Sequence, residues 1–587
     1  MCVNHLRDQV FSPSMAILME SEPNWIVKEV REDLLRQVDE AHAAAPLAPL
    51  VRRLLAQRGL ADESSIERFL SPRLQDLSDP FLMPDMRPAV TRILEAVDAK
   101  ERVVLYGDYD VDGVTSIALM QGILAHYGLE CQCFLPHRID EGYGVSMAGI
   151  ERCLAEFQPQ LIIAVDCGTT SIEEVQYLKD KEVDVIICDH HECRPNERPN
   201  CVALVNPKVG DDYHYLCSAG VAFKVAHALL KERPNPKVDL KKFLDIVALG
   251  TVADIVPLVG ENRILVRKGL QCLRDTENCG LIALKRETKL GAIIQTSDIG
   301  FRLGPRLNAA GRLDTAKAAL DLLLETDSSK AQELAQNLDR QNSERQELEY
   351  RMYEEASAML ENGNDPKDRC TIVLGSDDWH PGVVGIVASR LMRRFHRPTF
   401  VVAFDETGFG KGSGRSVEKI SLVSALHACE DLLIKGGGHE MAAGLSIWKQ
   451  NFPDFQKRFE EIVASNARSE YLIPKLYVDA EVDLNILTLS LMDSYEQLEP
   501  FGSNNPQPLL LAKGVELAGE PTVISKKHLR LELYQNGTIR EAIYFGAVEM
   551  DLPKPPWDVA FTIQRNEYRG RQSLQIHVSD VRASYQC

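Results

Sequence analysis

Short apolar runs alternate with helix-like stretches between about residues 85 and 325. Three of these runs hold four or five residues each and are rich in Val and Ile, at 103–106, 161–165 and 185–188. Short apolar strands separated by helices are typical of a parallel sheet covered on both faces. We therefore predict a parallel-sheet α/β domain over residues 81–327, with ligands at the carboxyl ends of its strands.

A long polar stretch follows this domain. Residues 328–361 are rich in Glu and Gln, lack Gly and Pro, and carry their apolar residues on roughly one helical face. The pattern predicts a helix about 50 Å long, and we assign residues 328–363 to a helix that links two domains. Strand-like and helix-like runs then return over 370–465, which predicts a second, smaller α/β domain at 364–468.

The hydrophobic pattern changes again near the end of the chain. Residues 529–534 alternate apolar and polar side chains and are followed by Asn536-Gly537, a strong hairpin signal, and a second such hairpin extends from 560 to 578. Alternating strands joined by tight turns favour an OB-like antiparallel β-barrel, which we place at 469–587. Residues 1–80 are interpreted as an N-terminal accessory segment.

Composition limits the classes of protein to which the chain can belong. The 587 residues include 66 Lys and Arg against 86 Asp and Glu, a net charge of -20. This length predicts about three or four domains, and the acidic balance argues against a protein that coats DNA or anionic membrane by bulk charge. A local basic surface remains compatible with it.

The cellular compartment is predicted from two further features. No run of about 18 apolar residues is present, so we expect no transmembrane helix, and the first 24 residues lack the pattern of a signal peptide. The 14 cysteines include no C-x-x-C pair, and several lie in apolar runs. We therefore expect reduced thiols in a cytosolic protein. Met1, Met15 and Met19 are alternative starts.

Acidic residues follow each of the three predicted strands. The set comprises Asp108, Asp110 and Asp112, then Asp166, then the run Asp189-His190-His191, and later Asp254. One such acidic turn alone would be read as solvated, but these residues can converge on one sheet edge, where close carboxylates repel unless cations lie between them. Carboxylates with one or two imidazoles suit Mn²⁺ or Mg²⁺, and the absence of thiolates nearby argues against structural zinc.

Four ordered motifs resemble those of the DHH phosphoesterase superfamily. They are Tyr106–Gly113, Val165–Gly168, Asp189–His191 and Ala253-Asp254. The resemblance implies catalysis with two divalent ions, Mn²⁺ or Mg²⁺. By motif position, one ion would be held by Asp108, Asp110 and Asp166, and the other by Asp112, the bridging Asp166, His190 and Asp254.

Two further roles come from the same motifs. The resemblance implies that His191 contacts the scissile phosphate and that Asp189 orients the histidine pair. In some members a His stands where this chain has Tyr106, which leaves the ligand set of the first metal open.

Segments 135–144, 218–224 and 304–313 narrow the resemblance to the RecJ family of single-stranded-DNA-specific exonucleases, from about residue 45 to the end of the chain. Segments 379–390, 410–416 and 436–439 resemble the DHH-associated (DHHA1) domain, which holds nucleic acid against the metal centre. The predicted substrate-binding residues are Tyr143, His191, Arg306, Asn308, Arg312, His380, Ser413, Arg415, Ser416 and His439.

Each of these substrate contacts also has a purely structural interpretation. The arginines of 304–313 could be solvated in a loop that begins a helix, the glycine-rich runs could be plain turns, and His380 or His439 could be buried for packing. Residues 381–420 contain seven Lys and Arg against three acids, and we expect this local surplus to help hold the substrate strand. Cations near tyrosines in the terminal barrel, among them Arg530 and Arg565, are expected to assist.

The family resemblance implies an exonuclease that degrades single-stranded DNA from 5′ to 3′, releases 5′-mononucleotides, and acts in recombination and repair in a bacterial-type cytoplasm. The polarity rests on the resemblance alone. The single-strand-binding protein and a RecQ-type helicase are candidate partners. Two alternatives stay open: a related phosphodiesterase on short oligoribonucleotides or cyclic dinucleotides, and a non-catalytic replisome scaffold of the same fold.

Overall fold

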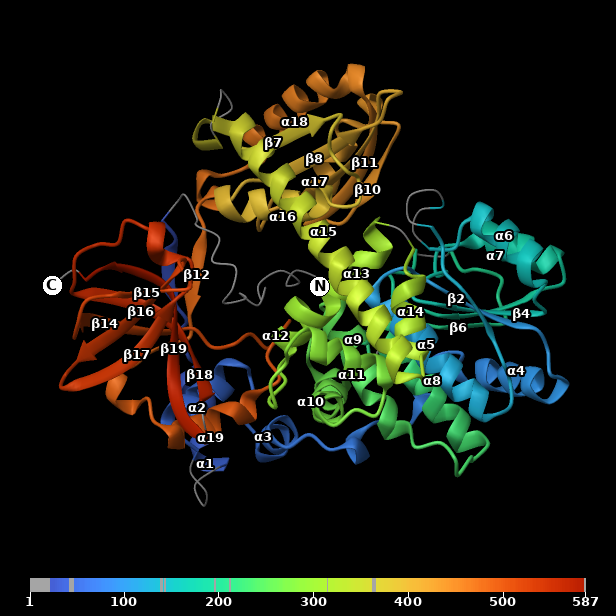
Figure 1. Ribbon diagram of the computed structural model, residues 1–587, viewed down its shortest axis with the longest axis horizontal. Helices are drawn as coiled ribbons and strands as arrows, with labels where there is room; N and C mark the ends of the chain where they lie inside the picture. The colour runs from blue at the N-terminus through green and yellow to red at the C-terminus, as the bar shows by residue number, and fades with distance from the viewer. Residues whose placement is uncertain are drawn as a thin grey trace. The chain divides into compact units, whose positions relative to one another are not determined.

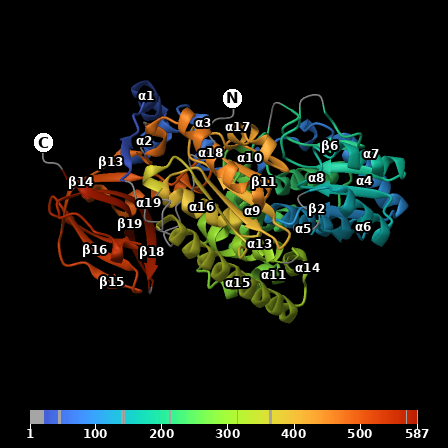
Figure 2. The ribbon, with the colours of Figure 1, turned by 90° about the horizontal axis from the view of Figure 1, so that it is seen from above.

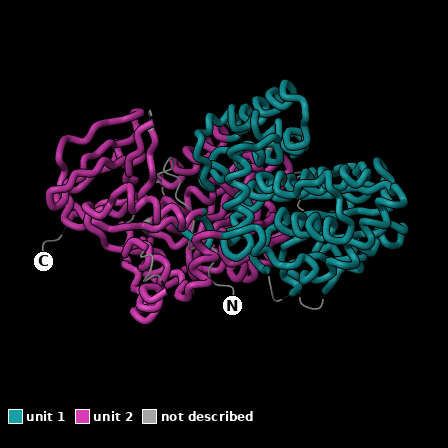
Figure 3. The backbone as a smooth tube through the Cα atoms, turned by 90° about the horizontal axis from the view of Figure 1, so that it is seen from below, with its two compact units in different colours: residues 1–10, 72–345, 500–506 teal, residues 11–71, 346–499, 507–587 magenta. Residues whose placement is uncertain are grey.

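The computed structural model describes residues 22–41, 47–137, 141, 144–194, 197–210, 213–313, 315–361, 366–568 and 570–584. These residues form two compact units (Figure 3). Within the described ranges, unit 1 comprises residues 72–345 and 500–506, and unit 2 comprises the remainder. None of the helices in these ranges is long and apolar enough to cross a membrane.

Unit 1 is built on a five-stranded sheet in which every neighbouring pair is parallel, in the order β3-β2-β4-β5-β6. The predicted parallel α/β fold is therefore confirmed. Strand β2 supplies Val103 and Leu105 to one hydrophobic cluster and Val104 and Tyr106 to the other, as a strand buried on both faces must. The strands are β2 (Val103–Gly107), β3 (Gln132–Phe134), β4 (Leu161–Val165), β5 (Asp184–Cys188) and β6 (Ala203–Val205).

Helices cover both faces of this sheet (Figure 1). The larger cluster packs α4 (Met86–Ala99), α5 (Val111–His126) and α8 (Ser218–Glu232) against one face. The smaller cluster packs α6 (Met147–Phe157) and α7 (Ile172–Asp180) against the other. This arrangement leaves the carboxyl ends of the strands open for chemistry.

The second half of unit 1 is helical. The helices are α9 (Leu244–Ala253), α10 (Gly260–Arg274), α11 (Cys279–Glu287), α12 (Thr296–Asp298), α13 (Gly304–Leu313) and α14 (Lys317–Leu324). The segment at 304–313 is therefore helix α13, whereas the sequence allowed a loop there. Gly250 lets α9 approach α5 closely, because a Cβ atom at this position would lie 2.5 Å from Thr115 Oγ1 and 2.8 Å from Asp112 Oδ1.

The predicted linking helix is confirmed as α15 (Ser328–Glu361), a single helix without a break (Figure 2). Its residues up to 345 belong to unit 1 and those from 346 belong to unit 2. It forms ion pairs in both units, from Asp339 to Arg306 and from Glu349 to Arg390.

Unit 2 contains a second α/β sheet, in the order β10-β11-β9-β8-β7, where β7 and β8 are parallel and the other pairs are antiparallel. The strands are β7 (Ile372–Ser376), β8 (Thr399–Phe404), β9 (Phe409–Arg415), β10 (Lys435–Gly438) and β11 (Ala442–Trp448). The helices are α16 (Val384–Phe395), α17 (Leu422–His427) and α18 (Phe452–Asn466). The smaller α/β domain was thus predicted correctly in type.

The two glycine-rich runs of this domain are strands rather than turns, which corrects the sequence interpretation. Gly410 and Gly414 of β9 stand opposite Phe404 and Phe400 of β8. A Cβ atom at either glycine would lie 2.6 or 2.5 Å from the facing ring. The glycines therefore make room for aromatic side chains that lie across the neighbouring strand.

The C-terminal sheet has the order β13-β14-β18-β19-β17-β16-β15. An additional pairing of β14 with β16 partly closes it into a ring. The OB-like fold was predicted, but the sheet is not purely antiparallel, because β13 with β14 and β17 with β19 are parallel pairs. The strands are β13 (Ala480–Glu481), β14 (Leu510–Leu517), β15 (Thr522–Ile524), β16 (His528–Gln535), β17 (Thr538–Tyr544), β18 (Trp557–Tyr568) and β19 (Arg571–Ala583), with α19 (Leu489–Tyr495) between β13 and β14.

The N-terminal elements attach to this C-terminal region. Strand β1 (Asn24–Val27) pairs in parallel with β12 (Lys475–Val478). The indole N–H of Trp25 donates to Asp580 at 2.9 Å, and Lys28 Nζ lies 3.0 Å from Asp479. Helices α1 (Glu32–Ala41), α2 (Pro49–Gln57) and α3 (Glu63–Leu70) follow. Within the described ranges, residues 22–41 and 47–71 of the accessory segment are therefore part of unit 2.

Candidate active site

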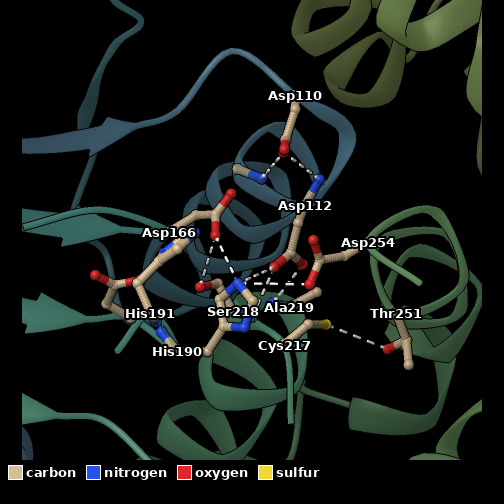
Figure 4. A network of polar contacts seen from close by, with 12 residues as sticks. Asp110, Asp112, Asp166, His190, His191, Cys217, Ser218, Ala219, Thr251 and Asp254 are labelled. Atoms are coloured by element: carbon tan, nitrogen blue, oxygen red, sulfur yellow. Dashed lines mark hydrogen bonds and ion pairs between the residues drawn. The ribbon is translucent and has the colours of Figure 1, made fainter. Parts of the chain in front are cut away.

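The acidic residues selected from the sequence converge at the carboxyl edge of the unit 1 sheet. Asp108 follows β2, Asp166 follows β4, His190 follows β5, and Asp254 ends α9. Asp110 caps the N-terminus of α5. Figure 4 shows the side chains of Asp110, Asp112, Asp166, His190 and Asp254 directed into one small region.

Three groups of side chains could each hold a metal ion. They are Asp108, Asp110 and Asp166; Asp112, His190 and Asp254; and Asp166, His190 and His191. Within each group, one ligand atom per residue lies within 4.8 Å of the others. Asp166 and His190 each belong to two groups, so the groups are neighbours that share side chains.

The electrostatics of the region disfavour uncompensated negative charge. Burial, followed by repulsion from neighbouring carboxylates, raises the pKa of Asp108, Asp166 and Asp254 well above the ordinary value. The same causes raise the pKa of Asp112 to about 6. Carboxylates crowded in a buried site become stable as anions when a dication lies between them.

The donor set fits Mn²⁺ or Mg²⁺. In the part of the chain that the structure describes, Asp108 Oδ2, Asp254 Oδ2 and His190 Nε2 are buried without a hydrogen-bond partner. His190 Nε2 lies 3.4 Å from both Asp166 Oδ1 and Asp254 Oδ2. Burial, then repulsion from His191, lowers the pKa of His190 to about 3, so its imidazole is neutral and able to coordinate. Oxygen donors with one imidazole are the ligands these ions accept.

The first acidic turn is shaped by two local features. Asp110 Oδ1 accepts hydrogen bonds from the backbone N–H groups of Asp112 and Gly113 at 2.9 and 3.1 Å, which satisfies the start of α5. A Cβ atom on Gly113 would lie 2.4 Å from the carbonyl oxygen of Asp108. The turn that brings three aspartates together therefore requires glycine at this position.

The two histidines differ in their surroundings. The side chain of His191 is 40% exposed and that of His190 is 10% exposed. His191 Nδ1 lies 2.7 Å from Asp189 Oδ1. Burial opposes protonation of His191, but the hydrogen bond to Asp189, together with the charges of Asp189, Asp112 and Asp110, raises the pKa of the imidazole above its ordinary value. His191 is thus the more accessible and more basic imidazole beside the carboxylates, whereas His190 is buried and neutral.

Tyr106, at the position where some relatives carry a histidine, belongs to none of the three groups. It is fully buried, its ring stacks on Phe134 at 4.7 Å, and its hydroxyl donates to the Gly144 carbonyl oxygen at 3.4 Å. Gly144 N–H in turn lies 3.4 Å from Asp108 Oδ1. Tyr106 therefore packs beneath the site and supports the segment next to Asp108.

Helix α13 carries three of the predicted substrate contacts. A Cβ atom on Gly311 would lie 2.7 Å from the Tyr109 carbonyl oxygen, so α13 packs directly on the acidic turn. At about 100° per residue, Asn308 and Arg312 lie on one side of the helix near Gly311, and Arg306 lies on another. Arg306 Nε donates to Asp339 of α15 at 2.7 Å. Arg306 is therefore engaged in an internal ion pair, and its predicted contact with phosphate stays a prediction.

The remaining predicted contacts lie in unit 2. Ser413 and Arg415 are neighbours on β9, where Arg415 Nη1 donates to Ser413 Oγ at 3.1 Å. His439 is exposed, and His380 Nδ1 accepts from Gly382 N–H at 3.0 Å. Ser416 is buried and its hydroxyl donates to the Ile420 carbonyl oxygen at 2.6 Å, so its placement does not support substrate contact. Tyr143 lies outside the described residues.

Several of the basic residues at 381–420 make internal contacts, and the expectation that this surplus helps to hold the substrate stays a prediction. Arg390 pairs with Glu349 at 3.2 Å, Arg394 donates to the Tyr353 hydroxyl, and Arg397 donates to several backbone carbonyls. In the C-terminal sheet, Arg565 pairs with Asp493 and Glu496, and Arg530 pairs with Glu541. These guanidinium groups are already neutralised by carboxylates or held by packing.

The start of helix α8 was not among the predicted site residues. Ser218 and Ala219 contact two of the aspartates through their backbone N–H groups and the Ser218 hydroxyl. Their segment, Ser218–Lys224, stood out in the sequence only as part of a family resemblance. A Ser at a helix start is a signal for capping, but here the hydroxyl bonds to an aspartate of the site instead of to its own helix end.

Comparisons with known proteins agree with this geometry. The sequence matches the DHH family N-terminal domain at 102–251, the DHHA1 domain at 368–465 and the RecJ OB domain at 478–580. It is 36% identical over 577 residues to the single-stranded-DNA-specific exonuclease RecJ of Bacillus subtilis, covering 97% of this chain and 72% of that protein. It is 35% identical over 580 residues to the Escherichia coli protein of the same name, covering 93% and 98%.

Solved structures give the same result. The crystal structure of RecJ from Thermus thermophilus in complex with Mn²⁺ is similar with a TM-score of 0.82 and 30% identity, covering 97% of this chain and 81% of that one. The corresponding complex with Mg²⁺ has a TM-score of 0.76 and 29% identity, covering 96% and 79%. Both ions that the donor set favours are thus bound in structural relatives.

Proposed function

The chain belongs to the RecJ family of single-stranded-DNA-specific exonucleases, and from that premise we propose that it degrades single-stranded DNA from the 5′ end and releases 5′-mononucleotides. The enzyme is a phosphodiester hydrolase that uses Mn²⁺ or Mg²⁺. The observation that carries the proposal is the convergence of buried carboxylates with unpartnered Asp108 Oδ2, Asp254 Oδ2 and His190 Nε2 at one sheet edge, within the described part of the chain.

We assign the two ions to two of the neighbouring groups. Asp108, Asp110 and Asp166 would hold one ion, and Asp112, Asp166, His190 and Asp254 would hold the other. When bound, a pair of divalent ions activates water and stabilises the charge that develops on the attacking and leaving oxygens of a phosphodiester.

The protein's own residues supply orientation and proton donation. Asp189 accepts from His191 Nδ1, which directs the opposite nitrogen of the imidazole outward as a donor. A protonated His191 can donate to a phosphate oxygen at the edge of the carboxylate cluster. Asn308 and Arg312 on α13, and Ser413, Arg415, His380 and His439 in unit 2, are proposed as contacts to the DNA backbone.

The domain division is retained as a proposal with parts at 1–80, 81–327, 328–363, 364–468 and 469–587. The three matched families fall inside the second, fourth and fifth of these parts. We further propose a cytoplasmic location, a role in recombination and repair, and the single-strand-binding protein and a RecQ-type helicase as partners. These finer assignments rest on the family.

The experiment compares long single-stranded DNA, duplex DNA and RNA di- or trinucleotides as substrates in the presence of Mn²⁺. Each substrate is labelled at the 5′ or the 3′ end. We expect early release of the 5′ label as mononucleotide from the long single strand, and little cleavage of the duplex. Early release of the 3′ label would contradict the polarity. Preference for the short RNA substrates would favour the alternative phosphodiesterase activity, which the family comparisons do not favour.

Two variants connect activity to the site. Asp166→Asn should lose activity by at least about 100-fold, since it removes a carboxylate shared by two metal groups. Asp275→Asn is the matched control, because Asp275 is an exposed acid of unit 1 whose side chain pairs with its neighbour Arg274. Full activity of Asp166→Asn would refute the metal centre, whereas a wild-type protein without nuclease activity would favour the scaffold alternative.

A further inference from the structure

The first turn of helix α8 donates hydrogen bonds to two of the carboxylates in the candidate active site (Figure 4). The backbone N–H of Ser218 donates to Asp112 Oδ2 at 2.7 Å, and that of Ala219 donates to Asp112 Oδ1 at 2.9 Å. The hydroxyl of Ser218 donates to Asp166 Oδ1 at 3.0 Å. One residue, Ser218, thus binds one aspartate through its backbone and another through its side chain.

These two aspartates differ in how many ions they are assigned to hold. Asp112 is assigned only to the second ion, with His190 and Asp254, whereas Asp166 is shared between that ion and the first one, with Asp108 and Asp110. Asp108 Oδ2 and Asp254 Oδ2 have no hydrogen-bond partner among the described residues, but both oxygens of Asp112 and one of Asp166 accept hydrogen bonds from α8. The protein therefore orients the carboxylate that both ions share and one that only the second ion uses, and leaves others available for an ion.

Asp166 also needs side-chain support for a backbone reason. Its φ angle is +62°, in the left-handed region that a residue with a Cβ atom rarely adopts. Conformations of this kind persist when surrounding contacts hold them. Besides the Ser218 hydroxyl, the backbone N–H of Asp166 donates to the Cys188 carbonyl oxygen at 3.1 Å. The Ser218 bond sets where the carboxylate points.

Helix α8 is itself locked in place six residues further along. Lys224 has a completely buried side chain, and its ammonium group lies 2.9 Å from Glu261 Oε2 and 2.9 Å from Ser78 Oγ. A buried cation must keep these partners, because losing them leaves an uncompensated charge. The ion pair therefore opposes rotation or translation of α8 and keeps Ser218 within hydrogen-bonding distance of the two aspartates.

We propose that Ser218 is a positioning residue that sets the spacing between the two metal sites by tying Asp112 to Asp166. This inference rests on the function proposed above. It predicts that the Ser218 hydroxyl matters for the second ion more than for the first, since one ion can draw in mobile carboxylates but two ions need carboxylates at a defined separation. Groups that orient metal ligands typically contribute about 10–100-fold in metal affinity.

The effect should depend on which metal is bound. Mg²⁺ requires nearly ideal octahedral geometry and keeps part of its water shell, so it tolerates displaced ligands poorly. Mn²⁺ binds nitrogen and carboxylate donors more tightly than Mg²⁺ can. Removal of the hydroxyl should therefore raise the Mg²⁺ concentration needed for half-maximal activity more than the corresponding Mn²⁺ concentration.

The test measures Mn²⁺ binding directly, by calorimetric titration and by electron paramagnetic resonance of the coupled Mn²⁺ pair. In Ser218→Ala we expect the first ion to bind within about 3-fold of wild type, the second to bind about 10–100-fold more weakly, and the coupled signal to fall accordingly. Ser218→Thr, which retains a hydroxyl, should restore most of the second-ion affinity. Ser218→Cys keeps the side-chain volume with a weak donor and covers the case in which the alanine variant fails to fold.

Ser116→Ala is the matched control. Ser116 is a buried serine on the neighbouring helix α5 whose Oγ has no hydrogen-bond partner within the described part of the chain. It should bind both ions as wild type does. Ser218→Ala with wild-type affinity for both ions and an unchanged coupled signal would overturn the inference while leaving the proposed function intact. A wild-type protein that binds two ions but does not degrade single-stranded DNA would overturn the proposed function while leaving the inference about Ser218 intact.

Discussion

Asp189 acts on the candidate active site from outside the three metal groups. Its Oδ1 accepts from the backbone N–H of His190 at 2.7 Å and lies 2.7 Å from His191 Nδ1, and its Oδ2 accepts from Thr169 N–H at 3.1 Å. Although burial opposes ionisation, the hydrogen bond to His191, together with the charges of the two histidines and the bond from Thr169, holds the pKa of Asp189 well below its ordinary value. Asp189 is therefore a charged residue that orients His191 and favours its protonation.

Replacement of Asp189 by Asn tests this role. The amide removes the charge that favours protonated His191, so we expect turnover to fall about 10–100-fold while Mn²⁺ affinity stays within a few-fold of wild type. Steady-state kinetics and Mn²⁺ titration on the same preparation separate the two effects. Asp184→Asn, an exposed acid at the start of the same strand, is the control. Loss of Mn²⁺ binding as severe as in Asp166→Asn would instead make Asp189 a ligand.

Functional residues could be predicted from the sequence where their role follows from their position at the end of a strand. The aspartates after the strands could be selected because each stands at a strand end and parallel strands end together. The partners of Arg306 and Ser218 could not be predicted, since they depend on packing between residues that are far apart in the chain. The Ser218 bonds to Asp112 and Asp166 join residues 106 and 52 positions apart. No local pattern indicates such a contact.

At the level of elements, the glycines of strand β9 make room for large side chains of the neighbouring strand. Its core-facing positions Gly410, Gly412 and Gly414 lie under the side chains of β8, and a Cβ atom on Gly414 would approach the Phe400 ring to 2.5 Å. The alternate positions carry Lys411, Ser413 and Arg415 on the opposite face. The strand thus presents polar side chains on one face because glycine on the other face accommodates the aromatic core.

Gly414→Ala should therefore destabilise the protein by about 1–3 kcal/mol, because the added methyl group overpacks a buried ring. The loss is measured by chemical or thermal unfolding. Gly437→Ala in strand β10 of the same sheet is the control, since a Cβ atom there meets nothing within 4 Å. Phe400→Leu combined with Gly414→Ala should recover part of the loss. Equal effects of the two alanine variants would show that Phe400 does not limit this position.

Element types were largely predictable and some pairings were not. Strands β2, β4 and β5 of the first sheet, helix α15 and the hairpin of β16 with β17 were predicted from hydrophobic periodicity and from the Asn536-Gly537 turn, whereas the three-residue strands β3 and β6 were not. The parallel pairs of the terminal sheet join strands that are not neighbours along a hairpin. Hydrophobic periodicity identifies a strand but not the strand with which it pairs, so the OB-like barrel could be predicted and its two parallel pairs could not.

For the whole molecule, the net charge says less about DNA binding than the positions of the charged residues do. The net charge of -20 includes aspartates that face one another in the candidate active site, where divalent ions would neutralise them. Several of the arginines expected to attract DNA are paired internally instead, as Arg390 is with Glu349 and Arg565 is with Glu496. Affinity for DNA must then come from a few placed contacts and the metal ions rather than from bulk charge.

Segments of unit 2 that are far apart in the chain also pack together, which composition could not reveal. Strand β1 pairs with β12, and Asp479 accepts from Lys28 Nζ while its carbonyl oxygen accepts from Gln57 Nε2 at 2.8 Å. The described residues of the N-terminal accessory segment thus contact the segment that leads into the terminal sheet. The sequence places a domain boundary near residue 80 because the segment comes first in the chain. In the structure, Lys28 and Gln57 instead contact Asp479, which lies 451 and 422 positions away.

The most direct test of the whole account is a crystal structure of the protein soaked in Mn²⁺, with the ions located by anomalous scattering. We predict two peaks about 3.5–4 Å apart, one bound by Asp108, Asp110 and Asp166 and the other by Asp112, Asp166, His190 and Asp254. A single peak, or two peaks that do not share Asp166, would contradict the proposed centre.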